Sequence, residues 1–158
     1  MIAPSMAEVV RSAGGWLFDQ VMAGWDVTVL TADQTNSRPL RILGVRAADL
    51  ESSLASPAPG PSPQAIAVRA DLYGSDERVR QLVLNAVWDG QAEVRLWGDG
   101  CTPDFDGKAD PVSHRLSVAA RAFKAQALAA AAAPADPGQV TEIFRTGRAR
   151  RPSAVSAG

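Results

Sequence analysis

The sequence contains few of the residue types on which metal sites and nucleophilic catalysis usually depend. Cys101 is its one cysteine and His114 its one histidine. A single cysteine excludes an internal disulfide framework and a zinc site built from several cysteines. It also leads us to expect a reducing, cytoplasmic compartment. Cys101 and His114 could act as nucleophile and base only if the fold brought them together. No third residue that would orient such a pair is evident, so we predict no catalytic residue and no metal site.

Long apolar runs and phosphate-binding loops are also lacking. No stretch approaches about 18 consecutive strongly apolar residues, so we predict no membrane span. Neither a P-loop pattern ending in Gly-Lys-Ser/Thr nor G-x-G-x-x-G occurs, so we expect no nucleotide cofactor. A nucleotide could still bind at a helix N-terminus, for instance near Ser75. The net charge of −1 gives no global field that would favour nucleic acid or a membrane surface.

The first clear element is a helix that begins after Ser5. Ser5 and Glu8 match a capping box, and Gly24 is a suitable left-handed stop. The helix is also predicted by an apolar stripe at helical spacing: Val10, Ala13, Leu17 and Val21. Gly14 and Gly15 lie in its middle, where each costs about 1 kcal/mol relative to alanine. We attribute them to close packing on a sheet, with a kink or an opening for a ligand as the alternative.

The rest of the chain alternates between strand and helix patterns. The predicted elements are a strand at 26–32, a helix at 38–43, a strand at 45–50, a proline-rich connection at 56–63, a strand at 65–72, a helix from Ser75 to Gly90, a strand at 92–97 near a sheet edge, and a helix at 110–133. A strand at 40–45 followed by a helix remains an alternative. The alternation predicts an α/β fold. We expect one three-layer domain, 1–138, with a mainly parallel sheet of about four strands flanked by helices.

Residues 139–158 are expected to form a polar C-terminal tail. Within it, Val140, Ile143 and Phe144 could dock on the domain as a short amphipathic turn. The tail also contains four arginines that could contact nucleic acid or an acidic partner: Arg145, Arg148, Arg150 and Arg151. A solvated tail is the simpler interpretation.

Candidate ligand-binding residues lie where predicted strands end, because ligands of open parallel sheets bind outside the carboxyl ends of the strands. These residues are Asp33, Asp71, Tyr73 and Asp99. Loop capping would explain Asp33 and Asp71 equally well. The following loop contains Asp104-x-Asp106-Gly107, which matches part of a calcium loop. A third ligand before the glycine and a later glutamate are missing, so we expect a solvated loop.

Tryptophan is frequent for a chain with so few aromatic residues. The four tryptophans flank the first helix and the strand at 92–97: Trp16, Trp25, Trp88 and Trp97. Most simply, they pack the edges of the core. The alternative is a shared interface patch, since tryptophan is enriched at binding hot spots.

These observations favour, mainly by exclusion, a non-catalytic binding module for a partner protein or a small ligand, with a role in regulation or assembly. A homodimer is compatible with this hypothesis. The first alternative is an enzyme for a small metabolite, with its site at the strand ends and using Asp33, Asp71 or Asp99. The second alternative is a nucleic-acid accessory protein that uses the arginine-rich tail.

Overall fold

A computed structural model describes residues 1–56, 59–90, 92–100, 102, 104–105, 110–147 and 149. The strands are β1 (Ile2–Ala3), β2 (Thr28–Thr31), β3 (Arg46–Asp49), β4 (Ala65–Arg69), β5 (Glu93–Trp97), β6 (Asp110–Arg115) and β7 (Thr141–Thr146). The helices are α1 (Met6–Met22), α2 (Arg38–Ile42), α3 (Leu50–Ala55), α4 (Ala70–Ser75), α5 (Glu77–Gly90) and α6 (Val118–Ala130).

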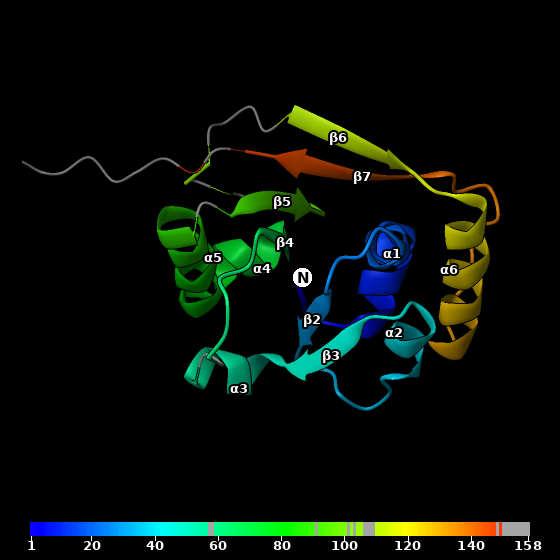
Figure 1. Cartoon of the computed structure of the whole chain (residues 1–158), viewed down its shortest axis with the longest axis horizontal. Helices are drawn as coiled ribbons and strands as arrows, with labels where there is room; N and C mark the ends of the chain where they lie inside the picture. The colour runs from blue at the N-terminus through cyan, green and yellow to red at the C-terminus, as the bar shows by residue number, and fades with distance from the viewer. Residues whose placement is uncertain are drawn as a thin grey trace, which may run out of the picture.

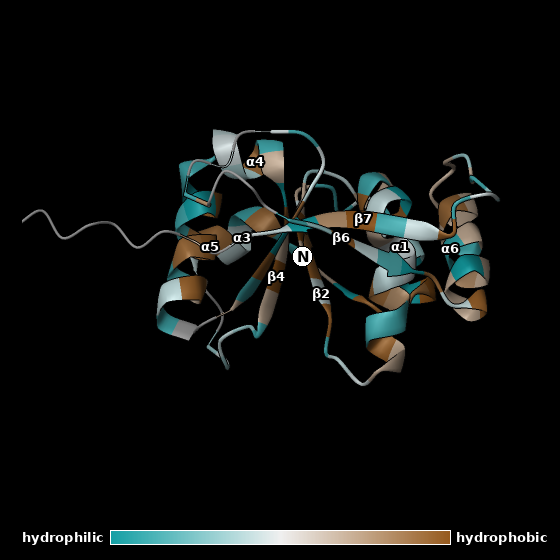
Figure 2. Cartoon of the chain, turned by 90° about the horizontal axis from the view of Figure 1, so that it is seen from above, coloured by the Kyte–Doolittle hydropathy of each residue, from teal (hydrophilic) through white to brown (hydrophobic). Residues whose placement is uncertain are grey.

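The described strands form one mixed sheet between two layers of helices. Their order is β3-β2-β1-β4-β5-β7-β6, and the first five of these run parallel. Strand β7 is antiparallel to both of its neighbours. Helices α1, α2 and α6 lie on one side of the sheet, and α3, α4 and α5 on the other (Figure 1). Hydrophobic residues run along β2 and β4 between these layers (Figure 2).

Each side of the sheet has its own apolar core. One core joins α1 and α6 to the sheet through Val10, Ala13, Leu17 and Leu128. The other joins α4 and α5 to the sheet through Tyr73, Val79 and Val83. Within the described residues, no helix combines the length and the apolar character needed to cross a bilayer.

Elements with strong sequence patterns are confirmed. The Ser5 hydroxyl accepts the N–H of Glu8 at 3.3 Å at the start of α1. The predicted helix at 38–43 corresponds to α2, with Pro39 in its first turn. The predicted strand at 45–50 corresponds to β3. The alternative strand at 40–45 is wrong, because Leu40 is a buried residue of α2.

The sheet is larger and more mixed than the predicted set of about four parallel strands. The structure adds β1, which is only two residues long and too short to show any periodicity. It also replaces the start of the helix expected at 110–133 with β6, and α6 begins only after Ser117. Strand β5 pairs with β4 and β7, so its predicted place near a sheet edge is also wrong.

Strand β7 lies where a short amphipathic turn of the tail was expected. Its side chains reverse the usual rule, because Glu142 is 1% exposed whereas Ile143 is 66% exposed. Phe144 is fully buried. A buried carboxylate beside an exposed isoleucine hides the alternation by which strands are recognised.

Three further corrections concern the helices that follow β3 and β4. The strand predicted at 65–72 ends at Arg69, and α4 follows at once. Asp76, and not Ser75, lies at the start of α5, where its Oδ1 accepts the N–H of Arg78 at 2.9 Å. Helix α3 was not predicted, although Asp49 caps it by accepting the N–H of Ser52 at 2.8 Å. In the exposed connection at 56–63, residues 57 and 58 lie outside the described residues.

Candidate functional site

The strand order reverses direction between β1 and β4. From β1 the chain moves to β2 and β3 on one side, and β4 and β5 then extend the sheet on the other. At such a point the connections leave opposite faces, and a crevice forms at the carboxyl ends of the strands. A pocket of about 530 Å³ lies there. It is lined by Glu8, Arg11 and Ser12 of α1, by the last residue of β4 (Arg69) and Asp71 of α4, and by the last residue of β5 (Trp97) with Gly98, Asp99 and Gly100 of the loop that follows it.

A charged group of three side chains is central to this pocket. The Glu8 carboxylate accepts from Nη1 of Arg69, and Nε of Arg69 lies 2.8 Å from Oδ1 of Asp71. The hydrogen bond to Glu8 is the main cause that raises the pKa of Arg69. All three side chains are partly exposed. A guanidinium has five N–H donors, so Arg69 retains donors for a bound molecule.

Trp97 supplies an unsatisfied donor among the pocket residues. Its side chain is 5% exposed, and its Nε1 is buried without a hydrogen-bond partner among the described residues. The guanidinium of Arg69 lies 5.9 Å from the centroid of its ring. A buried donor without a partner costs about 1–3 kcal/mol. Trp16 and Trp88 have buried indole N–H groups of the same kind, so this one does not by itself mark a ligand site.

The loop after β5 closes the pocket through a glycine. Gly100 has φ of +152°, and a Cβ built on it would lie 2.5 Å from the backbone nitrogen of Asp71. That Cβ would also lie 2.6 Å from the carbonyl carbon of Ala70. Nη2 of Arg145 donates to the carbonyl oxygen of Gly98 at 2.9 Å and ties the same loop to β7. The close approach of this loop to the backbone of Ala70 and Asp71 therefore needs glycine at position 100.

Replacing Gly100 by alanine should lower the free energy of unfolding by about 1–3 kcal/mol, the usual range for a strained backbone position. The added methyl would meet backbone atoms, which cannot turn aside as a side chain can. Urea denaturation followed by circular dichroism measures the change. Gly60→Ala is the matched control, because nothing lies within 4 Å of its Cβ position. Equal stabilities of the two variants would contradict this description of the loop.

Two of the four predicted ligand residues line the pocket, and two do not. Asp71 and Asp99 are pocket residues. Asp33 lies in the exposed loop after β2, where its Oδ1 accepts the N–H of Thr35 at 3.1 Å. Hydrogen bonds from Thr35 lower the pKa of Asp33. Tyr73 is fully buried in the core under α4 and α5.

Tyr73 and Asp104 anchor the loop that follows β5. The Tyr73 hydroxyl donates to Oδ2 of Asp104 at 2.6 Å, and Nε of Arg80 donates to the same oxygen at 2.6 Å. The hydrogen bond from Arg80 is the main cause that lowers the pKa of Asp104. Asp106 and Gly107 of the partial calcium pattern lie outside the described residues. Among the residues described, no group of three His, Cys, Asp or Glu side chains could hold a metal ion.

The four tryptophans differ in burial and do not gather in one exposed patch. Trp16 and Trp97 belong to the core on the α1 side, and Trp16 packs on Phe144 with ring centroids 4.9 Å apart. Trp88 is half-buried on α5. Trp25 is 45% exposed after the end of α1. An interface role of the tryptophans stays a prediction, for which Trp25 is the most accessible of the four.

His114 joins β6 to α1. Its Nε2 lies 2.8 Å from Oδ2 of Asp19, and Oγ of Ser117 donates to Oδ1 of Asp19 at 2.6 Å. The carboxylate therefore lies between the two other groups, and His114 is not placed to activate Ser117. Cys101, the residue that was considered with His114 as a nucleophile and base, lies outside the described residues.

The stabilising effect of Asp19 should disappear in acid. Burial raises the pKa of Asp19, but hydrogen bonds from Ser117 and His114 outweigh burial and lower it below 3.8. A lowered carboxyl pKa stabilises the fold above the pKa of the unfolded chain, and this contribution is lost as pH falls through the folded-state value. Asp19→Asn should therefore destabilise the protein at pH 7, and the difference from wild type should shrink towards pH 2. Urea unfolding at a series of pH values measures it, and a constant difference would contradict the assignment.

Of the arginines predicted to lie in a tail, Arg145 belongs to β7 and contacts the pocket loop. Arg148, Arg150 and Arg151 lie outside the described residues. A role of these side chains toward nucleic acid stays a prediction.

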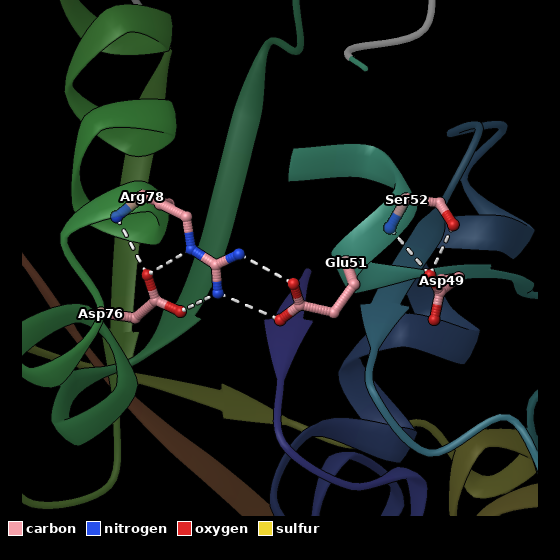
Figure 3. A network of polar contacts seen from close by, with 5 residues as sticks. All are labelled: Asp49, Glu51, Ser52, Asp76 and Arg78. Atoms are coloured by element: carbon pink, nitrogen blue, oxygen red, sulfur yellow. Dashed lines mark hydrogen bonds and ion pairs between the residues drawn. The ribbon is translucent and has the colours of Figure 1, made fainter. Parts of the chain in front are cut away.

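A second pocket, of about 520 Å³, lies between α3 and α5. Arg78 at its side is held by Glu51 at 2.7 Å and by Asp76 at 3.0 Å (Figure 3). The hydrogen bonds that Arg78 donates to Glu51 and Asp76 raise its pKa. All three nitrogens of the Arg78 guanidinium donate to these two carboxylates. The pocket between β1 and β4 is therefore the stronger candidate.

Sequence reasoning missed Glu8, Arg11, Ser12 and Arg69. Glu8 was assigned to the capping box, but its side chain pairs with Arg69 across the pocket. The missing signal was strand β1, just before the cap. Recognising that strand would have placed the first turns of α1 at the carboxyl edge of the sheet.

No protein-family model matches this sequence, and neither does any curated protein. Two solved structures share the fold. One is a deacetylase triple mutant from the teicoplanin biosynthetic pathway, with a TM-score of 0.64 and 15% identity over 94% of this chain and 97% of that chain. The other is the deacetylase of the A40926 pseudoaglycone, with a TM-score of 0.59 and 17% identity over 96% of this chain and 97% of that chain.

This comparison corrects the first functional hypothesis. Both neighbours are enzymes, so the hypothesis of a non-catalytic binding module is wrong, and its enzyme alternative is favoured. At these identities the likeness shows the fold, and the reaction has to be argued from the pocket. The chain has the α/β fold of two deacetylases.

Proposed function

We propose that the protein is an enzyme that removes an acyl group from a small molecule by hydrolysis. The observation that carries the proposal is the accessible group of Glu8, Arg69 and Asp71 in the pocket between β1 and β4. The shared fold of two deacetylases supports the reaction class. The proposal assigns the chemistry to side chains of this chain.

Glu8 is the side chain proposed to move protons. As water attacks the acyl carbon, the Glu8 carboxylate accepts a proton from it, and a new C–O bond forms. The tetrahedral intermediate then collapses, the C–N bond breaks, and the proton on Glu8 passes to the leaving nitrogen. The products are a carboxylic acid and an amine, so atoms and charge balance.

Arg69 is proposed to stabilise the negative oxygen of the tetrahedral intermediate. Glu8 and Asp71 occupy Nη1 and Nε and fix the plane of the guanidinium. The remaining N–H groups can donate to a developing oxyanion, an interaction worth most when the donor is held in place beforehand. Trp97 lines the same pocket, so its indole signal can report on a bound substrate.

One titration tests both the activity and its location. Nitrogen-labelled protein is mixed in turn with N-acetylated amino sugars, amino acids and short peptides, and proton NMR records released acetate in the same tube. We expect acetate from at least one class of substrate, together with a shift of the Trp97 indole signal. The indole signal of the exposed Trp25 is the control and should stay in place. Absence of acetate throughout the panel, or a shift at Trp25 alone, would contradict the proposal.

A further inference from the structure

Backbone N–H groups in the middle of α1 donate hydrogen bonds to the carboxylate of Glu142 in β7. The N–H of Gly15 donates to Oε1 of Glu142 at 3.0 Å, and the N–H of Trp16 donates to Oε2 at 2.7 Å. Each amide carries one hydrogen, so these bonds compete with the helical bonds to carbonyls one turn earlier. Glu142 thus acts on the second half of α1 as a capping residue acts on a helix N-terminus.

Lys124 of α6 contacts the same point of α1. We call the contacts of Glu142 and Lys124 with the backbone of Arg11, Gly15 and Trp16 the joint. Its Nζ donates to the carbonyl oxygen of Arg11 at 2.7 Å, to Oε1 of Gln139 at 2.6 Å and to Oε1 of Glu142 at 2.6 Å. These three bonds use all the donors of an ammonium group. The side chains of Lys124 and Glu142 are 6% and 0% exposed. The carboxylate of Glu142 therefore accepts from the N–H groups of Gly15 and Trp16, and the ammonium group of Lys124 donates to the carbonyl of Arg11 before them.

Gly15 allows this close approach. A Cβ on Gly15 would lie 2.4 Å from Cδ2 of Leu116, which is itself buried. A larger residue at this position would force either the buried side chain of Leu116 or α1 itself to shift. From the sequence, the glycine pair was attributed to close packing on a sheet, with a kink or an opening for a ligand as the alternative. In the structure Gly15 packs closely against Leu116, and its N–H donates to the carboxylate of Glu142.

The joint divides α1 between the pocket and the rest of the core. Glu8, Arg11 and Ser12, which line the pocket, all precede it. Arg11 is held directly, since its carbonyl accepts from Lys124. The second half of α1 has its own attachment, because Asp19 bonds with Ser117 and His114. The first half packs in the core through Met6, Val9 and Val10, and the bond from Lys124 to the carbonyl of Arg11 is its polar attachment.

We infer that the buried Glu142–Lys124 pair positions the first half of α1, and with it Glu8, against Arg69 across the pocket. Glu142 and Lys124 are positioning residues, because they act on the pocket through the backbone of α1. The inference rests on the proposed function only in its kinetic consequence. The geometry of the Glu8–Arg69 pair can be measured whether or not a substrate is known.

The test is the double variant Lys124→Met/Glu142→Gln, which removes both charges and keeps similar volumes. Asp19→Asn is the control, because it weakens the attachment of the other half of α1. NMR of the Nε–H of Arg69 and of the amides of residues 6–12 reports on the pocket. We expect these signals to move in the double variant and to stay in place in the control. If the double variant does not fold, the same NMR signals are compared between wild type and Glu142→Gln, and we again expect them to move.

The kinetic readout uses a substrate of the wild-type enzyme. Misplacing a catalytic group by about 1 Å can cost on the order of 100-fold in rate, so we expect kcat to fall by about 10- to 100-fold while KM changes little. A folded variant with unchanged Arg69 and 6–12 signals would overturn the inference. A wild type without acetate release would instead contradict the proposed function, and the NMR comparison would still decide the inference.

Discussion

Lys124→Met should lower the free energy of unfolding by about 3–5 kcal/mol, the usual result of removing one partner of a buried ion pair. Glu142 would keep its hydrogen bonds to Gly15 and Trp16 but would lose the opposite charge that neutralises it. Burial raises the pKa of Glu142, and Lys124 is the main group that opposes this. Urea denaturation at pH 7, followed by circular dichroism, measures the loss.

Two further variants distinguish the effect of leaving the Glu142 charge unpaired from the effect of removing a lysine or arginine side chain from α6. Arg121→Met replaces an exposed basic residue of the same helix and should change stability by less than about 0.5 kcal/mol. Lys124→Met/Glu142→Gln should be more stable than Lys124→Met, since no uncompensated carboxylate is left. A single variant that costs less than about 1 kcal/mol, or a double variant less stable than the single one, would contradict the description of the joint.

Glu8→Gln should reduce kcat/KM for acyl hydrolysis by about 100- to 10,000-fold, the usual contribution of a general base. Glutamine has nearly the same shape and can still accept from Arg69, but its amide cannot take a proton from water. KM should change less than kcat, because the substitution removes an interaction made in the transition state. Steady-state kinetics by acetate release measure both constants.

Glu51→Gln is the matched control for this substitution. Glu51 also pairs with an arginine, at 2.7 Å from Arg78, but it lies outside the pocket between β1 and β4. It should leave kcat/KM within about twofold of wild type, since exposed ion pairs contribute at most about 1 kcal/mol. If Glu8→Gln behaves like Glu51→Gln, Glu8 is not the general base.

Sequence reasoning succeeded where local patterns decide the structure. Ser5, Pro39 and the apolar stripe of α1 mark helices that the structure contains. Asp71 and Asp99, which were chosen by the rule that ligands bind at strand ends, line the pocket, and their role in binding stays a prediction. Each of these signals spans a few residues, and so it can be read without knowing the tertiary contacts.

The wrong predictions share a physical cause: a residue far away in the sequence satisfies a side chain, so that its burial or its partner differs from what the local pattern predicts. Glu142 is polar yet buried, because Lys124 and two amides of α1 satisfy it. That partnership hid β7 and made its sequence look like part of a tail. Glu8 fits a capping box by spacing, but its carboxylate accepts a hydrogen bond from Arg69, which is 61 positions away. Pairings of this kind are set by the fold and leave no local signature.

The central claim is that this chain hydrolyses an acyl group in the pocket between β1 and β4, with Glu8 as the base. The most direct measurement is acetate release in isotopically labelled water, by wild type and by Glu8→Gln, with the product analysed by mass spectrometry. The predicted result is acetate that carries one labelled oxygen in the wild-type reaction and almost none formed by the variant. Equal release by both proteins, or acetate without the label, would contradict the account.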